Sequence, residues 1–233
     1  MRHEARIGVM PLGGGEVKWL PVEPCYVFHV GNAREDGSGR IILDAVRYTR
    51  AAFKATWARM AGEREIAPRS GGLYRWTIDP RSASVRGEWL DDRGIEFPTL
   101  DDRRTGGSYR FLYAVAQGRA RGLLKYDLAR GAVRTAGLGG AWIPGEAVFV
   151  PRTADGDGDG DGDGDGDGDE DGGWLLTIVA HARGGPSRLV VLDARDLSVT
   201  AQVHLPRRVP LGFHGAWIPD HHLVKKGSRG MNL

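Results

Sequence analysis

The sequence predicts an all-β protein with the repeat of a β-propeller, on two observations. A strand–turn–strand unit recurs: "LYRWTIDPRSASV" (73–85), "LLKYDLARGAV" (123–133) and "LVVLDARDLSV" (189–199) each run from an apolar strand through Asp and a polar turn to a return strand. The aspartates, Asp79, Asp127 and Asp193, are 48 and 66 residues apart, and the second interval becomes 49 when a 17-residue acidic tract is left out. Near-equal spacing of such units is typical of propeller blades, which are sheets of about four strands.

Further strand-like segments fill the intervals between these units. They are rich in β-branched and aromatic residues and are bounded by Gly, Pro or Asp; they span 25–29, 41–48, 109–116, 147–151, 174–180 and 199–204. One helix is predicted over 48–62, where Phe53, Trp57 and Met60 follow a helical spacing and Gly62 can end it. We interpret this apolar stripe as core packing.

The charge distribution is dominated by one tract. Residues 155–171 hold nine Asp and one Glu, so that the net charge of +2 becomes +12 for the remainder. The arginines of this basic remainder are scattered, with no basic run beyond Lys225-Lys226, and binding of nucleic acid is therefore not expected. Alternating Asp and Gly cannot bury apolar area, which predicts a disordered loop over 154–172; a flexible tail is predicted over 221–233.

The acidic tract also matches the spacing of an EF-hand calcium loop. The matching residues are Asp159, Asp161, Asp163, Gly164 and Glu170. A pure Asp-Gly repeat matches almost any acidic spacing, however, and no helices are predicted beside it. Specific calcium binding is therefore not expected.

Cysteine content and hydropathy limit the cellular locations that are expected for the protein. The single cysteine, Cys25, excludes an internal disulfide and a cysteine-based zinc site. The first residues lack the apolar region of a signal peptide, and no window approaches 18 uninterrupted apolar residues. The expected location is the cytoplasm.

Two of the seven histidines stand out, because His29 and His214 each follow a phenylalanine at the end of an apolar segment and precede small or turn-forming residues. Taken alone, either is a core histidine bonded to the backbone or a ligand. Glu96 and Glu146 lie in apolar, strand-prone sequence, where a buried carboxylate needs a partner. Each either reaches water at a strand end or accepts the N–H of a metal-bound imidazole. No nucleophile elbow, P-loop or dinucleotide-binding motif occurs.

Six stretches, in order from about residue 6 to 219, together resemble the carotenoid cleavage oxygenase family, including its bacterial stilbene-cleaving relatives. They are "RIGVMPLGGG", "VEPCYVFHVGNAREDG", "IILDAVRY", "LDDRGIEFPTLDDRRTGGSYRFLYA", "GEAVFVPR" and "LPRRVPLGFHGAWIP". The resemblance implies a seven-bladed propeller with one non-haem Fe(II) ion on its axis, held by four histidines, three of which are backed by glutamates. It assigns His29 and His214 as the third and fourth ligands and Glu96 and Glu146 as two of the glutamates.

The resemblance also implies a reaction and a substrate class. The family's dioxygenases use O₂ to cleave a conjugated C=C bond of a carotenoid, an apocarotenoid or a stilbenoid into two carbonyl products, with no catalytic group beyond the metal centre. An apolar tunnel orients the substrate, and Phe28, Phe213 and Trp217 are the candidates to line it. Peripheral membrane contact is a possible property of the full-length family.

The chain departs from the family pattern at its start. It begins just before the third-ligand segment, so the resemblance covers the C-terminal part of the propeller, about four blades over 1–220, without two of the ligands and most of the membrane-facing lid. Two ligands hold Fe(II) more weakly than four, and the chain alone is expected to be an impaired enzyme. The alternative is a catalytically inactive propeller remnant that acts as a binding scaffold.

Overall fold

The computed structural model describes residues 5–62, 71–118, 121–152, 169–212 and 214–218. These residues form a two-stranded sheet and three four-stranded antiparallel sheets, each with its strands in sequence order. The two-stranded sheet consists of β1 (Ala5–Val9) and β2 (Lys18–Val22). The four-stranded sheets consist of β3 (Cys25–Glu35), β4 (Ile41–Thr49), β5 (Gly72–Asp79) and β6 (Ser84–Trp89); of β7 (Ile95–Thr99), β8 (Phe111–Ala116), β9 (Gly122–Asp127) and β10 (Ala132–Ala136); and of β11 (Trp142–Pro151), β12 (Gly173–His181), β13 (Arg188–Asp193) and β14 (Val199–His204).

The predicted all-β class and partial propeller are confirmed by this arrangement. The three repeated units of the sequence are the hairpins β5–β6, β9–β10 and β13–β14, which form the last two strands of each four-stranded sheet. The repeated aspartate ends the third strand and turns the chain: Asp79 accepts the N–H of Arg81 at 2.9 Å, and Asp193 accepts that of Arg195 at 2.8 Å. The spacing of these aspartates, near-equal once the acidic tract is left out, is therefore the spacing of the blades.

The aspartates that end the third strand of a blade should make the stability of the protein depend on pH. The hydrogen bond from Ser82 lowers the pKa of Asp79, and the guanidinium of Arg110 lowers that of Asp127. A carboxyl with a lowered folded-state pKa adds stability above its unfolded pKa, about 3.9, and loses it as pH falls through the folded value. Urea unfolding followed by tryptophan fluorescence should give a free energy of unfolding that falls below about pH 4. Asp79→Asn combined with Asp127→Asn should make that fall shallower, and an unchanged slope would refute the assignment.

The helix α1 (Arg50–Met60) follows β4 and contacts β3 and β4, as the sequence predicted for 48–62. The interpretation of its aromatic stripe as core is only partly right. Phe53 stacks on Tyr26 with ring centroids 4.2 Å apart, but Trp57 is 58% exposed. Among residues 50–58, for which burial is described, the buried positions of the helix are Ala52 and Ala55, whose small side chains let the helix lie close to the sheet.

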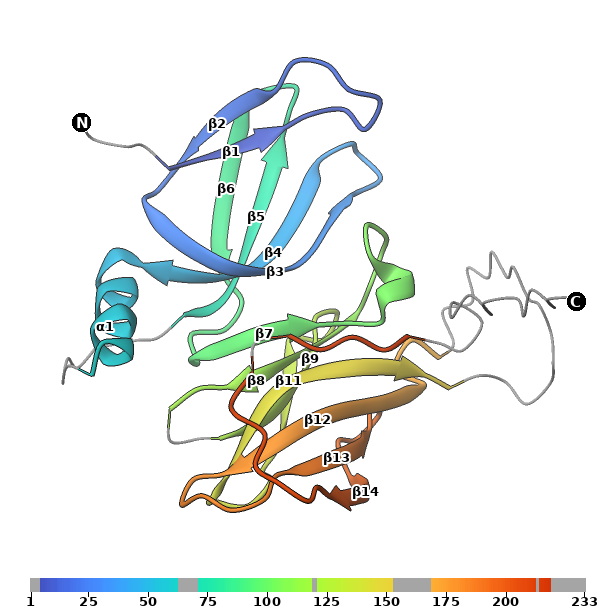
Figure 1. Ribbon diagram of the computed structural model, residues 1–233. Coiled ribbons are helices and arrows are strands. Elements are labelled where there is room, and N and C mark those ends of the chain that lie inside the picture. The colour runs from blue at the N-terminus through green and yellow to red at the C-terminus, as the bar shows by residue number, and fades with distance from the viewer. Residues whose placement is uncertain (1–4, 63–70, 119–120, 153–168, 213, 219–233) are drawn as a thin grey trace, which may run out of the picture.

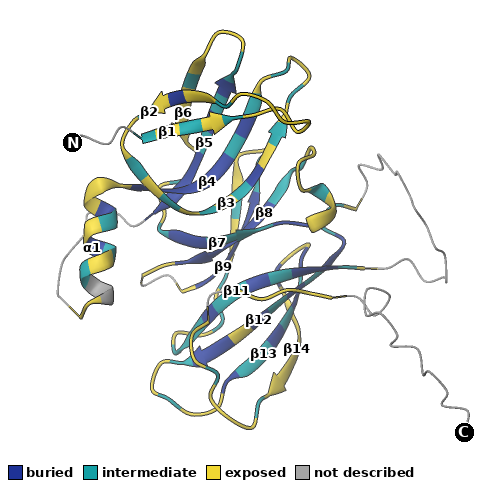
Figure 2. Cartoon of the chain, turned by 45° about the horizontal axis from the view of Figure 1, so that its top comes forward, coloured by how far each residue is buried: buried dark blue, intermediate teal, exposed yellow. Residues whose placement is uncertain are grey.

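Two apolar clusters join the three blades. One packs Val46 and Leu73 of the first blade against Leu112 and Leu124 of the second. The other packs Tyr113 and Leu123 of the second blade against the third; its members there include Phe149, Leu175 and Leu192. Figure 1 shows the blades stacked in chain order, and in Figure 2 the dark, buried strands lie inside the stack while β14 is exposed along its length.

A buried ionic network holds the first blade to the loop before β8. Asp44 on β4 is fully buried and receives two hydrogen bonds of 2.7 Å from the guanidinium of Arg75 on β5. The hydroxyl of Tyr109 also donates to Asp44. The bonds from Asp44 raise the pKa of Arg75 above its ordinary value, and burial followed by the charge of Asp44 raises that of Tyr109. One carboxylate thus ties two strands and a loop together.

The connection between β11 and β12 contains the acidic tract, and its residues 153–168 lie outside the described part of the chain. Its two ends meet: Pro151 pairs with Gly173, and the N–H of Arg152 donates to the carbonyl of Gly172 at 2.9 Å. Near its end, Glu170 accepts the N–H groups of Arg110 and Phe111, both at 2.7 Å. The last residues of the loop predicted over 154–172 thus make defined contacts with the second blade.

The helix content is small, and among the described residues no helix has the length and hydropathy needed to cross a membrane.

Candidate functional site

The first strands of the three blades, β3, β7 and β11, bring the predicted site residues together. Each is an edge strand of its own sheet, and β7 contacts both β3 and β11. Each also contains an irregularity in its pairing register, and these coincide with the site: His29 lies within the shift at Val27–Val30, Glu96 begins the shift to Thr99, and Glu146 lies within the shift at Pro144–Ala147. Because a bulge redirects a side chain out of the regular alternation, these shifts can aim the three side chains at the space between the blades.

His29 and Glu96 form a close pair. Nδ1 of His29 lies 2.6 Å from Oε2 of Glu96, whose side chain is only 10% exposed. The N–H of Phe97 also donates to Oε2, at 3.1 Å, and the hydroxyl of Tyr48 donates to Oε1. Because a carboxylate only accepts, the neutral imidazole carries its proton on Nδ1 and presents the lone pair of Nε2.

Phe97 has a strained backbone beside this pair. Its φ is 54°, in the left-handed region that a bulky residue rarely adopts, and Pro98 follows it. Its ring lies beside both histidines, with centroids 5.1 Å from His29 and 5.9 Å from His214, while the two imidazole centroids are 4.9 Å apart. The strain accompanies the register shift that places Glu96, as expected where a functional geometry is imposed on the chain.

His214 and Glu146 form a second, looser pair. Nδ1 of His214 lies 3.3 Å from Oε1 of Glu146, and the N–H of Gly215 donates to Oε2 at 2.7 Å. The His214 side chain is 59% exposed, against 22% for His29. The two pairs share one plan, an imidazole Nδ1 on a carboxylate that also accepts a backbone N–H, but only the His29 pair is tightly enclosed.

The two imidazoles face each other, with Nε2 of His29 3.3 Å from Nε2 of His214. With Nδ1 of each ring on a carboxylate, two lone pairs point at the same space, which is unfavourable unless a cation or proton lies between them. Imidazole nitrogens bind zinc at about 2.0–2.1 Å, and two nitrogens bound at such distances to one ion lie about 3.3 Å apart when the bonds enclose about 105°. The donor set therefore fits a metal ion. Within the described residues no group of three or more His, Cys, Asp or Glu side chains is placed to hold one.

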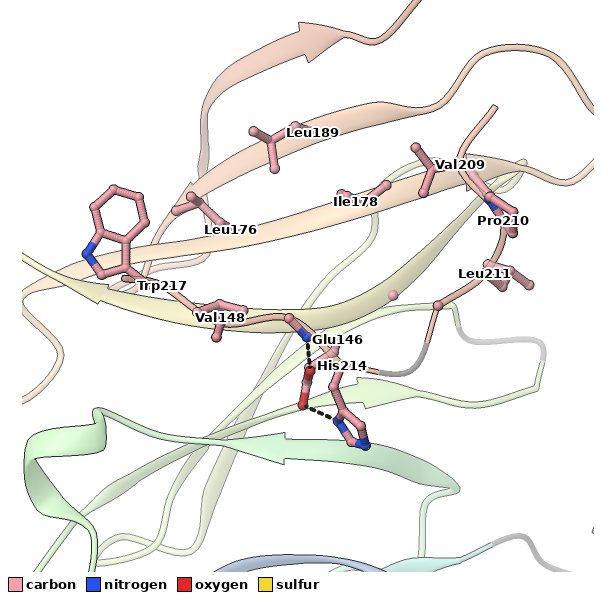
Figure 3. A pocket seen from close by; sticks show the side chains of 15 residues that line it. Glu146, Val148, Leu176, Ile178, Leu189, Val209, Pro210, Leu211, His214 and Trp217 are labelled. Carbon is pink, nitrogen blue, oxygen red and sulfur yellow. Dashed lines mark hydrogen bonds and ion pairs between the residues drawn. The ribbon is translucent and has the colours of Figure 1, made fainter. Parts of the chain in front are cut away.

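An apolar cavity of about 320 Å³ adjoins His214. Its walls are formed by residues of β11, β12 and β13 and by residues 209–212 and 214–217, and they include Leu176, Ile178, Leu189, Leu211 and Trp217. Figure 3 shows Leu176, Ile178, Leu189 and Trp217 on one side of β11, while the imidazole of His214 points away from them, toward its bond with Glu146. A polar pair thus stands at the rim of an apolar chamber.

The three predicted tunnel residues have different positions. Trp217 lines the cavity and is 50% exposed. Phe28 is 37% exposed and belongs to an aromatic group with Tyr26 and Tyr48; it is not one of the described residues that line this cavity. Phe213 lies outside the described residues.

Sequence reasoning missed Tyr48 and Phe97. Tyr48 reads as one more aromatic residue in a strand, and nothing in the sequence indicates that it reaches Glu96, a residue 48 positions away. Phe97 precedes a proline, which is normally a sign of extended backbone. Only the residue's φ shows otherwise.

Comparison with known proteins shows the family of the chain. A family model described as RPE65, "Retinal pigment epithelial membrane protein", matches residues 2–219. The chain belongs to the RPE65/carotenoid cleavage oxygenase family. Its relatives in this family include a Mycobacterium tuberculosis protein named carotenoid cleavage oxygenase, 36% identical, with 93% of this chain matched to 43% of the relative. They also include the apocarotenoid-15,15'-oxygenase of Synechocystis, 33% identical, with 91% of this chain matched to 42% of the relative.

Solved structures of the carotenoid cleavage oxygenase family share the fold. Cobalt-substituted Synechocystis ACO matches with a TM-score of 0.74 and 31% identity, over 92% of this chain and 44% of that one. An ACO/RPE65 chimera matches with a TM-score of 0.74 and 29% identity, over 92% and 44%. The chain therefore spans less than half the length of these family members.

Proposed function

We propose that the chain carries part of the centre of a non-haem Fe(II) dioxygenase that cleaves a conjugated C=C bond of a carotenoid, an apocarotenoid or a stilbenoid into two carbonyl products. The observation that carries the proposal is the pair of facing imidazole nitrogens, 3.3 Å apart, each with its opposite ring nitrogen on a glutamate. The names of the 36% and 33% identical relatives support the carotenoid class of substrate.

His29 and His214 would hold the metal through Nε2, and Glu96 and Glu146 would fix the tautomer and orientation of the two rings. Fe(II) bound there would supply the centre at which O₂ is activated for addition to an electron-rich alkene. Neutral imidazoles leave the ion its full charge, unlike a site in which a carboxylate is itself a ligand. The chain's own task in this reaction is thus to hold two neutral rings in place.

The apolar cavity beside His214 would position the substrate. Leu176, Leu189 and Trp217 offer apolar contacts to a polyene chain and few hydrogen-bond partners for water. We also propose Phe28 and Phe213 as lining residues, Phe28 from the aromatic group on the other side of His29. Peripheral contact with a membrane would give such a site access to an apolar substrate.

Metal binding tests the proposal directly. The purified chain, titrated with Fe(II) without oxygen or with Co(II) as an optical probe, should bind about one ion. His29→Ala together with His214→Ala should abolish that binding, because both proposed donors are lost. His204→Ala, on the exposed strand β14, is the matched control and should change nothing. Equal binding by the double variant and the control would show that the site is elsewhere.

The alternative function, a binding scaffold without catalysis, has one observation in its favour: the described residues offer the metal only two imidazoles. We propose that two ligands make the isolated chain a weak iron binder and an impaired enzyme. Incubation of the iron-loaded chain with an apocarotenoid, followed by the loss of polyene absorbance, separates the two. Quenching of tryptophan fluorescence by the polyene without metal binding or turnover would favour the scaffold.

A further inference from the structure

Tyr48 lies behind the His29–Glu96 pair, on the side away from His214. Its side chain is part of the core, with 3% of the residue exposed, and its hydroxyl donates to Oε1 of Glu96. The other carboxylate oxygen, Oε2, holds Nδ1 of His29 at 2.6 Å. The phenol, the carboxylate and the imidazole therefore form a continuous chain of hydrogen bonds that leads to Nε2 of His29, the atom that faces His214.

The position of the Tyr48 ring is fixed by its neighbours. The ring meets Phe28 edge to face, with centroids 5.4 Å apart. Gly71 also lies against the ring, and a Cβ atom added there would come within 2.5 Å of it. Any side chain larger than glycine at 71 would displace the tyrosine. The ring of Tyr48 thus occupies the space that the absence of a side chain at Gly71 leaves.

Among the residues that the structure describes, no tyrosine hydroxyl supports the second pair in this way. Glu146 is held by one backbone N–H, from Gly215, and its oxygen lies 3.3 Å from His214. Glu96 has the corresponding backbone bond, from Phe97, and in addition the bond from Tyr48. The shorter contact, 2.6 Å, belongs to the pair that has the phenol.

We propose that Tyr48 is a positioning residue for the metal centre: its hydroxyl orients the Glu96 carboxylate, which in turn sets the tautomer and direction of His29. A carboxylate with one oxygen fixed by a buried phenol cannot rotate away from the imidazole without leaving the hydroxyl unpaired in the core, which is costly. The orientation of His29 follows from this geometry alone. Its effect on metal affinity rests on the proposed function.

Tyr48→Phe removes the hydroxyl and keeps the ring, and two measurements follow its effect. In the metal-free chain labelled with ¹⁵N, the ring nitrogens of His29 report the tautomer, and the Nδ1 proton of the wild type should appear far downfield because of its short bond to Glu96. In Tyr48→Phe this proton should move upfield or broaden. The dissociation constant for Co(II), from its visible absorbance, should rise about tenfold, at the lower end of the effect typical for outer partners of a metal ligand.

Tyr126→Phe is the matched control. Tyr126 belongs to the same apolar cluster, is 2% exposed, and donates its hydroxyl to another carboxylate, Asp91, at 2.8 Å. It should lose comparable thermal stability and leave both the His29 proton and the Co(II) affinity unchanged. Equal effects of the two variants would overturn the proposal.

A double-mutant cycle with Glu96→Gln tests the route of the effect. If Tyr48 acts through Glu96, Tyr48→Phe should have little further effect on Co(II) affinity in the Glu96→Gln background. A full additional tenfold loss there would refute that route. Should the wild-type chain bind no Co(II), the proposed function fails, while the His29 proton still decides the role of Tyr48.

Discussion

Replacing Asp44 with asparagine is expected to lower the free energy of unfolding by about 3–5 kcal/mol, the loss typical when one partner of a buried ion pair is removed. Asp44 is fully buried and accepts both hydrogen bonds of the Arg75 guanidinium as well as that of Tyr109. An asparagine offers one acceptor oxygen and turns an amide N–H₂ group toward these donors. A domain of this size is stable by about 5–15 kcal/mol, so the variant should be close to unfolding at 37 °C.

Asp127→Asn is the matched control, because Arg110 grips Asp127 with the same two-bond geometry, at 2.8 and 2.6 Å. That pair is more open: the side chain of Asp127 is 14% exposed and that of Arg110 is 37% exposed. The loss there should be on the order of 1 kcal/mol. Urea unfolding at pH 7 measures both, and losses of similar size would show that burial does not set the contribution of Asp44.

The second large effect is expected at the metal centre. Glu96→Gln should raise the dissociation constant for Co(II) by about 10–100-fold. A glutamine amide can accept from one of the two donors, the Tyr48 hydroxyl or Nδ1–H of His29, but it places its own N–H₂ against the other. In a site where Glu96 is 7% exposed, no water compensates for that clash, and the imidazole must turn.

Glu146→Gln should have a smaller effect, because His214 is 59% exposed and its contact with Glu146 is 3.3 Å long. Glu88→Gln, on the exposed face of β6, controls for the loss of charge. Calorimetric titration of the three variants ranks them, and a Glu146 variant as weak as the Glu96 variant would contradict the unequal roles inferred for the two pairs.

The blade repeat could be predicted from the sequence because it depends on local signals. An Asp at the end of an apolar strand makes a turn whatever the rest of the molecule does, and Asp79, Asp127 and Asp193 therefore marked the third strand of every blade. The aromatic stripe of α1 misled for the opposite reason. Helical spacing shows which residues share a face, but the close approach of Ala52 and Ala55 to the sheet decided which face was buried.

The site was predictable in part. The apolar, strand-prone context singled out His29, His214, Glu96 and Glu146, and the resemblance to a family assigned their roles. The fold brings these four side chains together. How they meet depends on register shifts in three edge strands. Such shifts cannot be read from this sequence, because its strands do not follow a regular alternation of apolar and polar residues that a shift would interrupt. The contact between Tyr48 and Glu96 joins two blades and exists only once they pack.

The two ends of the connection between β11 and β12 are paired with each other, which makes this part of the chain suitable for engineering. Because Pro151 pairs with Gly173 and Arg152 with Gly172, the chain enters and leaves the connection at one point. The entropy of closing such a loop grows only slowly, by about 0.6 kcal/mol for each doubling of its length. Asp-Gly units could accordingly be added, deleted or exchanged for an affinity tag before Asp169 without loss of the blades. The anchoring carboxylate of Glu170 marks the limit beyond which such edits would reach the fold.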